Sequence, residues 1–72
     1  MVFEAQQRSL DGTSWEPIGE GDGTGDRATA MVVEQLGEES GFYRARPAGT
    51  DEKWAPYLLD IHGVAHYKEV IP

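Results

Sequence analysis

Cysteine is absent from this 72-residue chain. Its absence excludes disulfides and thiolate metal sites, so a domain of this size depends on its core or on a partner for stability. Long apolar runs are also missing, and the first residues, MVFEAQQRS, lack the charged and apolar regions of a signal peptide. We therefore expect a protein that spans no membrane and is not secreted by a signal peptide, located in the cytoplasm or incorporated in a soluble assembly.

Basic residues are scarce, because only 6 lysines and arginines stand against 13 acids, for a net charge of -7. Such a surface repels phosphate backbones and anionic membranes, so neither direct nucleic-acid binding nor membrane binding is expected. The hydrophobic content of 39% is sufficient for folding and argues against a disordered tail. The length allows a single domain, residues 1–72.

Alternating apolar and polar residues predict strands over residues 2–8, 14–19, 41–47 and 54–61. Between the first two strands, Asp11-Gly12 predicts a hairpin with a type I′ turn. Trp15, in the second strand, is expected to pack on the core. In the fourth strand, Ile61 is expected to continue the apolar face.

Residues 26–40 carry an apolar stripe at three- and four-residue spacing, which predicts one amphipathic helix. Asp26 is its expected N-cap, and Gly37 or Gly41 is expected to end it in a left-handed conformation. The stripe consists of Ala28, Met31, Val32, Gln35 and Leu36.

These elements predict an α+β fold of two layers, with one helix on a mainly antiparallel sheet of four or five strands. A ββαββ order and a β-grasp-like order both fit the sequence. Residues 19–26 are interpreted as a flexible loop. Residues 64–72 form either a fifth strand, with Ala65, Tyr67 and Ile71 in line, or a C-terminal arm.

The stretch GEGDGTGD, residues 19–26, lacks the chemistry that its glycines suggest. Its alternating glycines do not fit a dinucleotide fingerprint, and a phosphate-binding loop would need a lysine that is absent here. Arg27 and Val33 stand where a calcium loop of the EF-hand type requires glycine and glutamate. A solvated connection into the helix is the favoured interpretation, with a weak calcium site as the alternative.

His62 and His66 have the spacing of a zinc-protease pair, but Gly63 replaces the catalytic glutamate. Asp60 and Glu69 would complete a surface metal site, although two ordinary histidines near a turn is the favoured interpretation. No serine lies in a nucleophile elbow. We therefore predict no catalytic, cofactor or metal site and no enzymatic activity, and an enzyme or metal-binding protein using the two histidines is the weakest of three hypotheses.

One sheet face carries a set of side chains that suggests a partner. Arg44 and Arg46 share a strand face with Phe42, and Arg8 joins them if the first and third strands pair. One interpretation is cross-strand salt bridging to Glu4 and Glu16. The other is a partner-binding surface, and it consists of Arg8, Phe42, Arg44, Arg46 and Trp54.

The sequence thus predicts a small acidic, non-enzymatic protein that acts in protein–protein interaction or assembly. Accessory and structural subunits of bacteria or phages are of this kind. Its partner would be another protein or a second copy of itself. The alternative is an acidic inhibitor or nucleic-acid mimic for a basic groove, using Glu16, Glu20, Asp22, Asp26, Glu34, Glu38 and Glu39.

Overall fold

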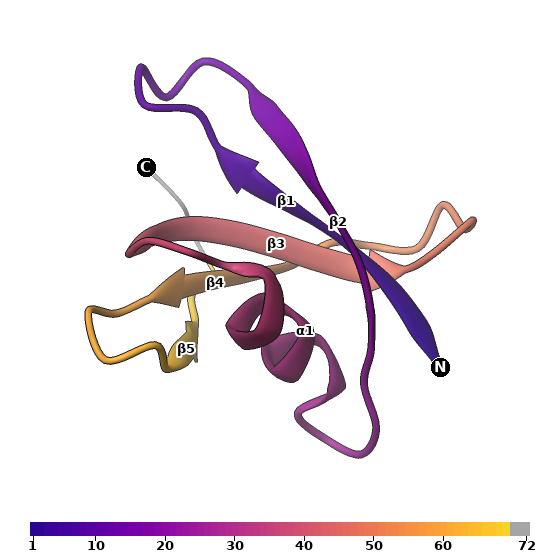
Figure 1. Cartoon of the computed structure of the whole chain (residues 1–72). Coiled ribbons are helices and arrows are strands. Elements are labelled where there is room, and N and C mark those ends of the chain that lie inside the picture. Colours follow the sequence, from indigo (N-terminus) through magenta and orange to yellow (C-terminus); the bar gives the residue numbers. More distant parts are fainter. Residues whose placement is uncertain (70–72) are drawn as a thin grey trace.

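The computed structural model of the chain describes residues 1–69, so the last residues of the predicted C-terminal arm, 70–72, lie outside the described residues. Between Met1 and Glu69, no helix has the length and apolar content needed to cross a membrane. The elements follow in the order β1 (Val2–Arg8), β2 (Trp15–Asp22), α1 (Ala28–Leu36), β3 (Gly41–Pro47), β4 (Ala55–Leu59) and β5 (Ala65–Tyr67) (Figure 1).

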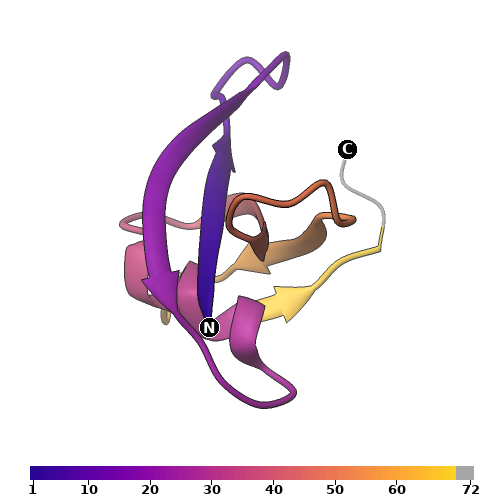
Figure 2. The same cartoon turned by 90° about the vertical axis from the view of Figure 1, so that its right-hand side faces the viewer.

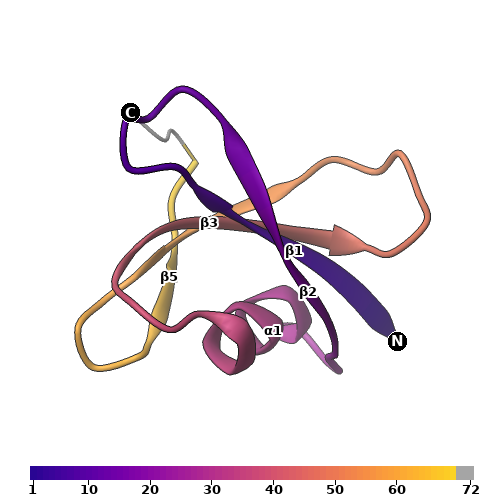
Figure 3. The ribbon, with the colours of Figure 1, turned by 45° about the horizontal axis from the view of Figure 1, so that its top comes forward.

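The five strands form one sheet in the order β2-β1-β3-β4-β5, and every neighbouring pair is antiparallel. The predicted class, one helix on an antiparallel sheet, is confirmed, and Figure 3 shows α1 on one side of the strands. The element order is ββαβββ, because β5 adds a strand to the predicted ββαββ order. A β-grasp-like order is not observed, since the two halves of the sheet meet through the antiparallel β1–β3 pair.

The β1–β2 hairpin is the longest part of the sheet, and its turn lies at the opposite end of the molecule from the N-terminus (Figure 2). Ser9 and Ser14 close this hairpin through a backbone hydrogen bond of 2.9 Å. Only Gly12 has a positive φ there, whereas a type I′ turn requires it at two residues, so the predicted turn type is wrong. The Asp11 carboxylate instead holds the loop by accepting hydrogen bonds from Ser9 and Thr13.

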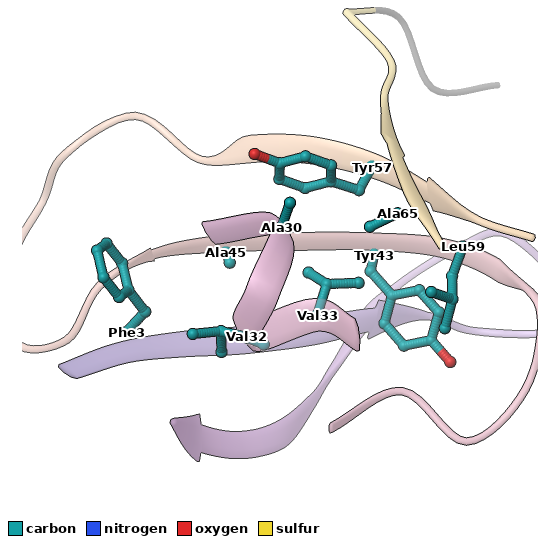
Figure 4. Close-up of a cluster of buried hydrophobic side chains, with 10 residues drawn as sticks. Phe3, Ala30, Val32, Val33, Tyr43, Ala45, Tyr57, Leu59 and Ala65 are labelled. Atoms are coloured by element: carbon teal, nitrogen blue, oxygen red, sulfur yellow. The ribbon is translucent and has the colours of Figure 1, made fainter. Parts of the chain in front are cut away.

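The core lies between α1 and the sheet (Figure 4). Val32, Val33 and Tyr43 are its largest fully buried side chains. The predicted helix stripe was rotated slightly from the buried face, because Ala30 and Val33 are buried while Met31 is only half-buried. The other predicted stripe residues lie at the edge of the core or outside it: Ala28 and Leu36 pack against it, and Gln35 is exposed.

The ends of α1 differ from the prediction. Asp26 does not cap the helix; the N-cap position is Arg27, without a side-chain cap, and the Ala28 N–H donates to the backbone of Gly25. Gly37 ends the helix with a φ of -72°, so it is not left-handed. Glycine is needed there for space, because a β-carbon would lie 2.5 Å from Cδ2 of the buried Leu59 and 2.9 Å from the backbone oxygen of Val33.

Three other predicted boundaries differ from those in the structure. β2 continues to Asp22, so only residues 23–27 connect it to α1, and the predicted loop 19–26 began too early. In the predicted C-terminal arm 64–72, Ala65–Tyr67 form strand β5. Ile61 does not continue the apolar face of β4, because β4 ends at Leu59; Ile61 lies in the following turn and is 84% exposed.

The buried face of α1 can be tested by comparing Val33→Ala with Met31→Ala. Val33→Ala should lower the free energy of unfolding by about 2 kcal/mol, since it empties part of a fully packed core. Met31→Ala removes apolar atoms from a half-buried site and should cost less than about 1 kcal/mol. Urea unfolding measures both losses, and a larger loss for Met31→Ala would contradict this orientation of the helix.

Candidate functional site

The face of the sheet opposite α1 carries the predicted partner-binding residues. Phe3 and Ala5 of β1 are buried in the core, so the alternate residues Gln6 and Arg8 lie on the other face. The predicted pairing of the first and third strands is present, and it sets Gln6 opposite Arg44. We call this side of the sheet the uncovered face.

Three arginines and two tryptophans form one continuous stack on the uncovered face. The Arg44 guanidinium carbon lies 4.4 Å from the ring centre of Trp15 and 4.3 Å from that of Trp54. Arg8 lies over Trp15 at 5.2 Å, and Arg46 lies over Trp54 at 4.1 Å. These distances fall within the range of cation–π attraction. We call these five residues the arginine–tryptophan ladder.

Trp15 is the member of the ladder that the sequence reasoning misplaced, since it was expected in the core. The β1–β2 register sets Trp15 opposite Arg8, and opposed residues share a face of the sheet. Counting outward from the Asp11-Gly12 turn would have given this pairing. Trp54 also follows the register, because it stands one residue before Ala55, whose partner is Ala45. Phe42 lies on the same face as Arg44, half-buried, outside the ladder.

The arginines of the ladder differ in their polar partners. Arg46 forms the predicted salt bridge with Glu4, at 3.2 Å between Nε and Oε2, and both side chains are mostly buried. Arg8 donates from Nε and Nη2 to the backbone oxygen of Gly12, at 3.0 and 2.6 Å. The predicted pairing with Glu16 is not found among residues 1–69, because Glu16 is opposite Gln7 on the side of the sheet that carries α1.

Arg44 sits at the centre of the ladder and has no carboxylate partner in the described part of the chain. Its Nε donates to Oε1 of Gln6 at 2.8 Å. Within residues 1–69 only this Nε bond is found for the guanidinium, and no buried side-chain nitrogen is left without a partner, so the two terminal nitrogens are open to solvent. Burial lowers the pKa of this guanidinium, and the positive charges of Arg46 and Arg8 lower it further. The group is nevertheless charged at neutral pH, because an arginine does not lose its proton in proteins.

His62 and His66, the residues of the alternative metal-site interpretation, contact Asp60 in different ways. His66 contacts the Asp60 carboxylate at 2.7 Å, whereas the His62 side chain is exposed and its backbone N–H donates to Asp60. Among residues 1–69, no group of three potential metal ligands is close enough to hold an ion. Asp60 therefore organises the β4–β5 turn, and the backbone N–H of Val64 and the His66 ring lower its pKa to about 2.

The acidic band of the alternative hypothesis is interrupted at Glu34. Its carboxylate pairs with Arg27 at 2.9 Å and accepts a 2.8 Å hydrogen bond from the Ala65 N–H. Both contacts lower the pKa of Glu34, the Arg27 hydrogen bond most strongly. Glu34 thus joins α1 to β5 and is occupied within the fold.

A shallow depression of about 440 Å³ lies along the β1–β2 hairpin. It contains hydroxyls and carboxylates but no histidine or lysine, and its Ser9 hydroxyl is already hydrogen-bonded to Asp11. The Asp11 carboxylate is a weak base here, because hydrogen bonds from Ser9 and Thr13 lower its pKa to about 2. Its lining consists of Gln7, Arg8, Ser9, Leu10, Asp11, Ser14, Glu16 and Glu39.

Comparison of the chain with protein-family models, with curated proteins and with solved structures gives no match.

The ladder should be measurable as an energetic coupling between Arg44 and Trp54. In a double-mutant cycle of Arg44→Gln and Trp54→Leu, we expect a coupling of about 1 kcal/mol, since leucine keeps apolar area but has no π face. Chemical unfolding of the four proteins gives the value. Additive losses would show that the two side chains are only neighbours.

The Asp60 contacts predict a loss of stability in acid. Because the folded-state pKa of Asp60 is about 2 and its ordinary value is 3.8, its contribution is complete above about pH 4 and disappears as the pH falls towards 2. An NMR titration should give a midpoint near 2 for Asp60. In His66→Ala the midpoint should rise only part of the way to 3.8, since the Val64 N–H remains the larger cause.

The matched variant is Asp60→Asn, which keeps an oxygen acceptor but has no charge to lose. Its melting temperature should approach that of the wild type as the pH is lowered from 5 to 2. An Asp60 midpoint near 4 in the wild type would contradict the assignment.

Proposed function

We propose that this protein is a small non-enzymatic interaction module whose uncovered face binds another protein. The observation that supports the proposal most directly is the arginine–tryptophan ladder. Tryptophan and arginine are the residue types most enriched among binding hot spots, since each combines a large contact area with directed hydrogen bonding. Two tryptophans and three of the four arginines of the chain lie in this one feature.

The ladder also differs in charge from the rest of the molecule. The chain carries a net charge of -7, yet positive charge is concentrated on one side of the sheet. The competing interpretation is that these arginines only form salt bridges within the chain. It accounts for Arg46 but not for Arg8 or Arg44, whose hydrogen bonds go to neutral acceptors. A partner that approaches this face would meet preordered aromatic rings, so little side-chain entropy is lost on binding.

Site-specific photo-cross-linking in the native source tests the proposal. A photoreactive residue replacing Phe42 lies on the uncovered face, whereas the same residue replacing Gln35 lies on the exposed side of α1. We expect a discrete adduct from position 42 that excess wild-type protein abolishes and excess Trp54→Ala protein does not. The adduct mass distinguishes a foreign partner from a second copy of the chain.

The control for folding is the thermal melt of each variant. Equal adduct yields from positions 42 and 35, or an adduct that Trp54→Ala competes as well as the wild type, would refute a role for the uncovered face.

A further inference from the structure

We propose that the terminal nitrogens of Arg44 form a binding site for a carboxylate, supplied by an acidic segment of a partner protein. This inference rests on the proposed function and assigns a chemical class to the partner. It starts from the environment of one guanidinium, which the other members of the ladder hold in place.

The two tryptophans restrict Arg44 to one way of binding. Trp15 reaches it from β2 and Trp54 from the segment before β4, so the rings approach from opposite sides of β3 in the sheet. Arg44 therefore lies between the two rings, within cation–π distance of both. Its Nε is bound to Gln6, which fixes the rotation of the group. Only the edge formed by the two terminal nitrogens is left for in-plane hydrogen bonds.

That edge matches a carboxylate. Two parallel N–H groups of a guanidinium pair with the two oxygens of a carboxylate, and such charge-assisted bonds are shorter and stronger than neutral ones. A guanidinium that is already stacked and hydrogen-bonded loses little freedom when it binds. Lysine, with a single rotating ammonium group, would supply neither the planar stack nor the fork.

The other two arginines of the ladder already have hydrogen-bond partners within the chain. Arg46 forms a salt bridge with Glu4 and also donates to the backbone oxygen of Glu52 at 3.4 Å. Arg8 uses two nitrogens on the oxygen of Gly12. Arg44, between these two positive charges, is the member whose charge gains most from an incoming anion.

The charge of the whole molecule favours a carboxylate on a peptide over a phosphate polymer. The net charge of -7 repels a long phosphate backbone, whereas a short acidic segment presents its few charges to the side of the sheet on which the ladder arginines lie. The flanking rings and Phe42 offer apolar contact to the stem of that side chain and to its neighbours.

Binding at Arg44 should change the intrinsic tryptophan fluorescence of the protein. Trp15 and Trp54 are the only two tryptophans in the chain, and both contact Arg44. The experiment is a titration of the full chain with a blocked hexaglutamate peptide, followed by tryptophan fluorescence, with hexaglutamine as the neutral control. We expect a saturable change with hexaglutamate only. In NMR spectra of the wild type, both indole N–H signals and the Arg44 Nε signal should shift with the same affinity.

The variant that tests the fork is Arg44→Lys, and Arg27→Lys on the other side of the molecule is its matched control. Arg44→Lys should weaken hexaglutamate binding about tenfold, because the bidentate pair is lost at constant net charge. Arg27→Lys should leave the affinity within about twofold. Melting curves establish that both variants are folded, and the wild-type NMR titration needs no variant.

Four results would overturn the inference: no response to hexaglutamate, equal binding by Arg44→Lys, tighter binding of inorganic phosphate at equal ionic strength, or a change caused by self-association. If the peptide fails while the cross-link from position 42 persists, the carboxylate site is wrong and the interaction surface stands. If the cross-link fails while Arg44-dependent peptide binding persists, the site stands and the proposed function is wrong.

Discussion

The contact of α1 with the sheet through Val32 and Val33 determines the rest of the structure. Both side chains are fully buried, and the strands contribute Tyr43 as the largest buried side chain. A helix of 9 residues is only about 14 Å long at 1.5 Å per residue, whereas five strands lie about 4.8 Å apart. One helix of this length covers one face of the sheet and no more. The chain must therefore stabilise the other face with its own strand side chains.

The arginine–tryptophan ladder performs that task. Trp15 and Trp54 pack against Arg44 on the uncovered face, so the guanidinium between them makes contacts that a hydrocarbon side chain would otherwise make. Each cation–π contact contributes roughly 0.5–2 kcal/mol, depending on how far the pair is desolvated. A layer of stacked arginines and tryptophans tolerates contact with water, so this face of the sheet does not require a second helix.

The sequence predicts the positions of the strands well. It predicts less well which side chains of α1 and β2 face the core. β1, β3 and β4 were predicted because residues such as Tyr43 and Ala45 alternate with polar neighbours, and a period of two leaves little ambiguity. The helix face was shifted because α1 has apolar side chains around more than one stripe, and packing against the sheet selects Val33 over Met31. The hydrophobicity of Trp15 predicts a core position, whereas the β1–β2 register places it opposite Arg8 on the uncovered face. Phe42 and the arginines were assigned to the correct face from alternation alone, but the stacking order depends on side-chain conformation, which the sequence does not contain.

The polar partners of Arg44 and Arg46 differ, and this difference suggests a separate role for each arginine of the ladder. A purely structural ladder would satisfy each guanidinium from within the chain, as Glu4 does for Arg46. Arg44 is instead oriented by a neutral amide and lies between two like charges, an arrangement that costs electrostatic energy in the isolated protein. An anion on its free edge would remove that cost, so binding would be strengthened by relief of repulsion as well as by new hydrogen bonds. In the function we propose, the same stack that stabilises the uncovered face orients Arg44 towards a partner.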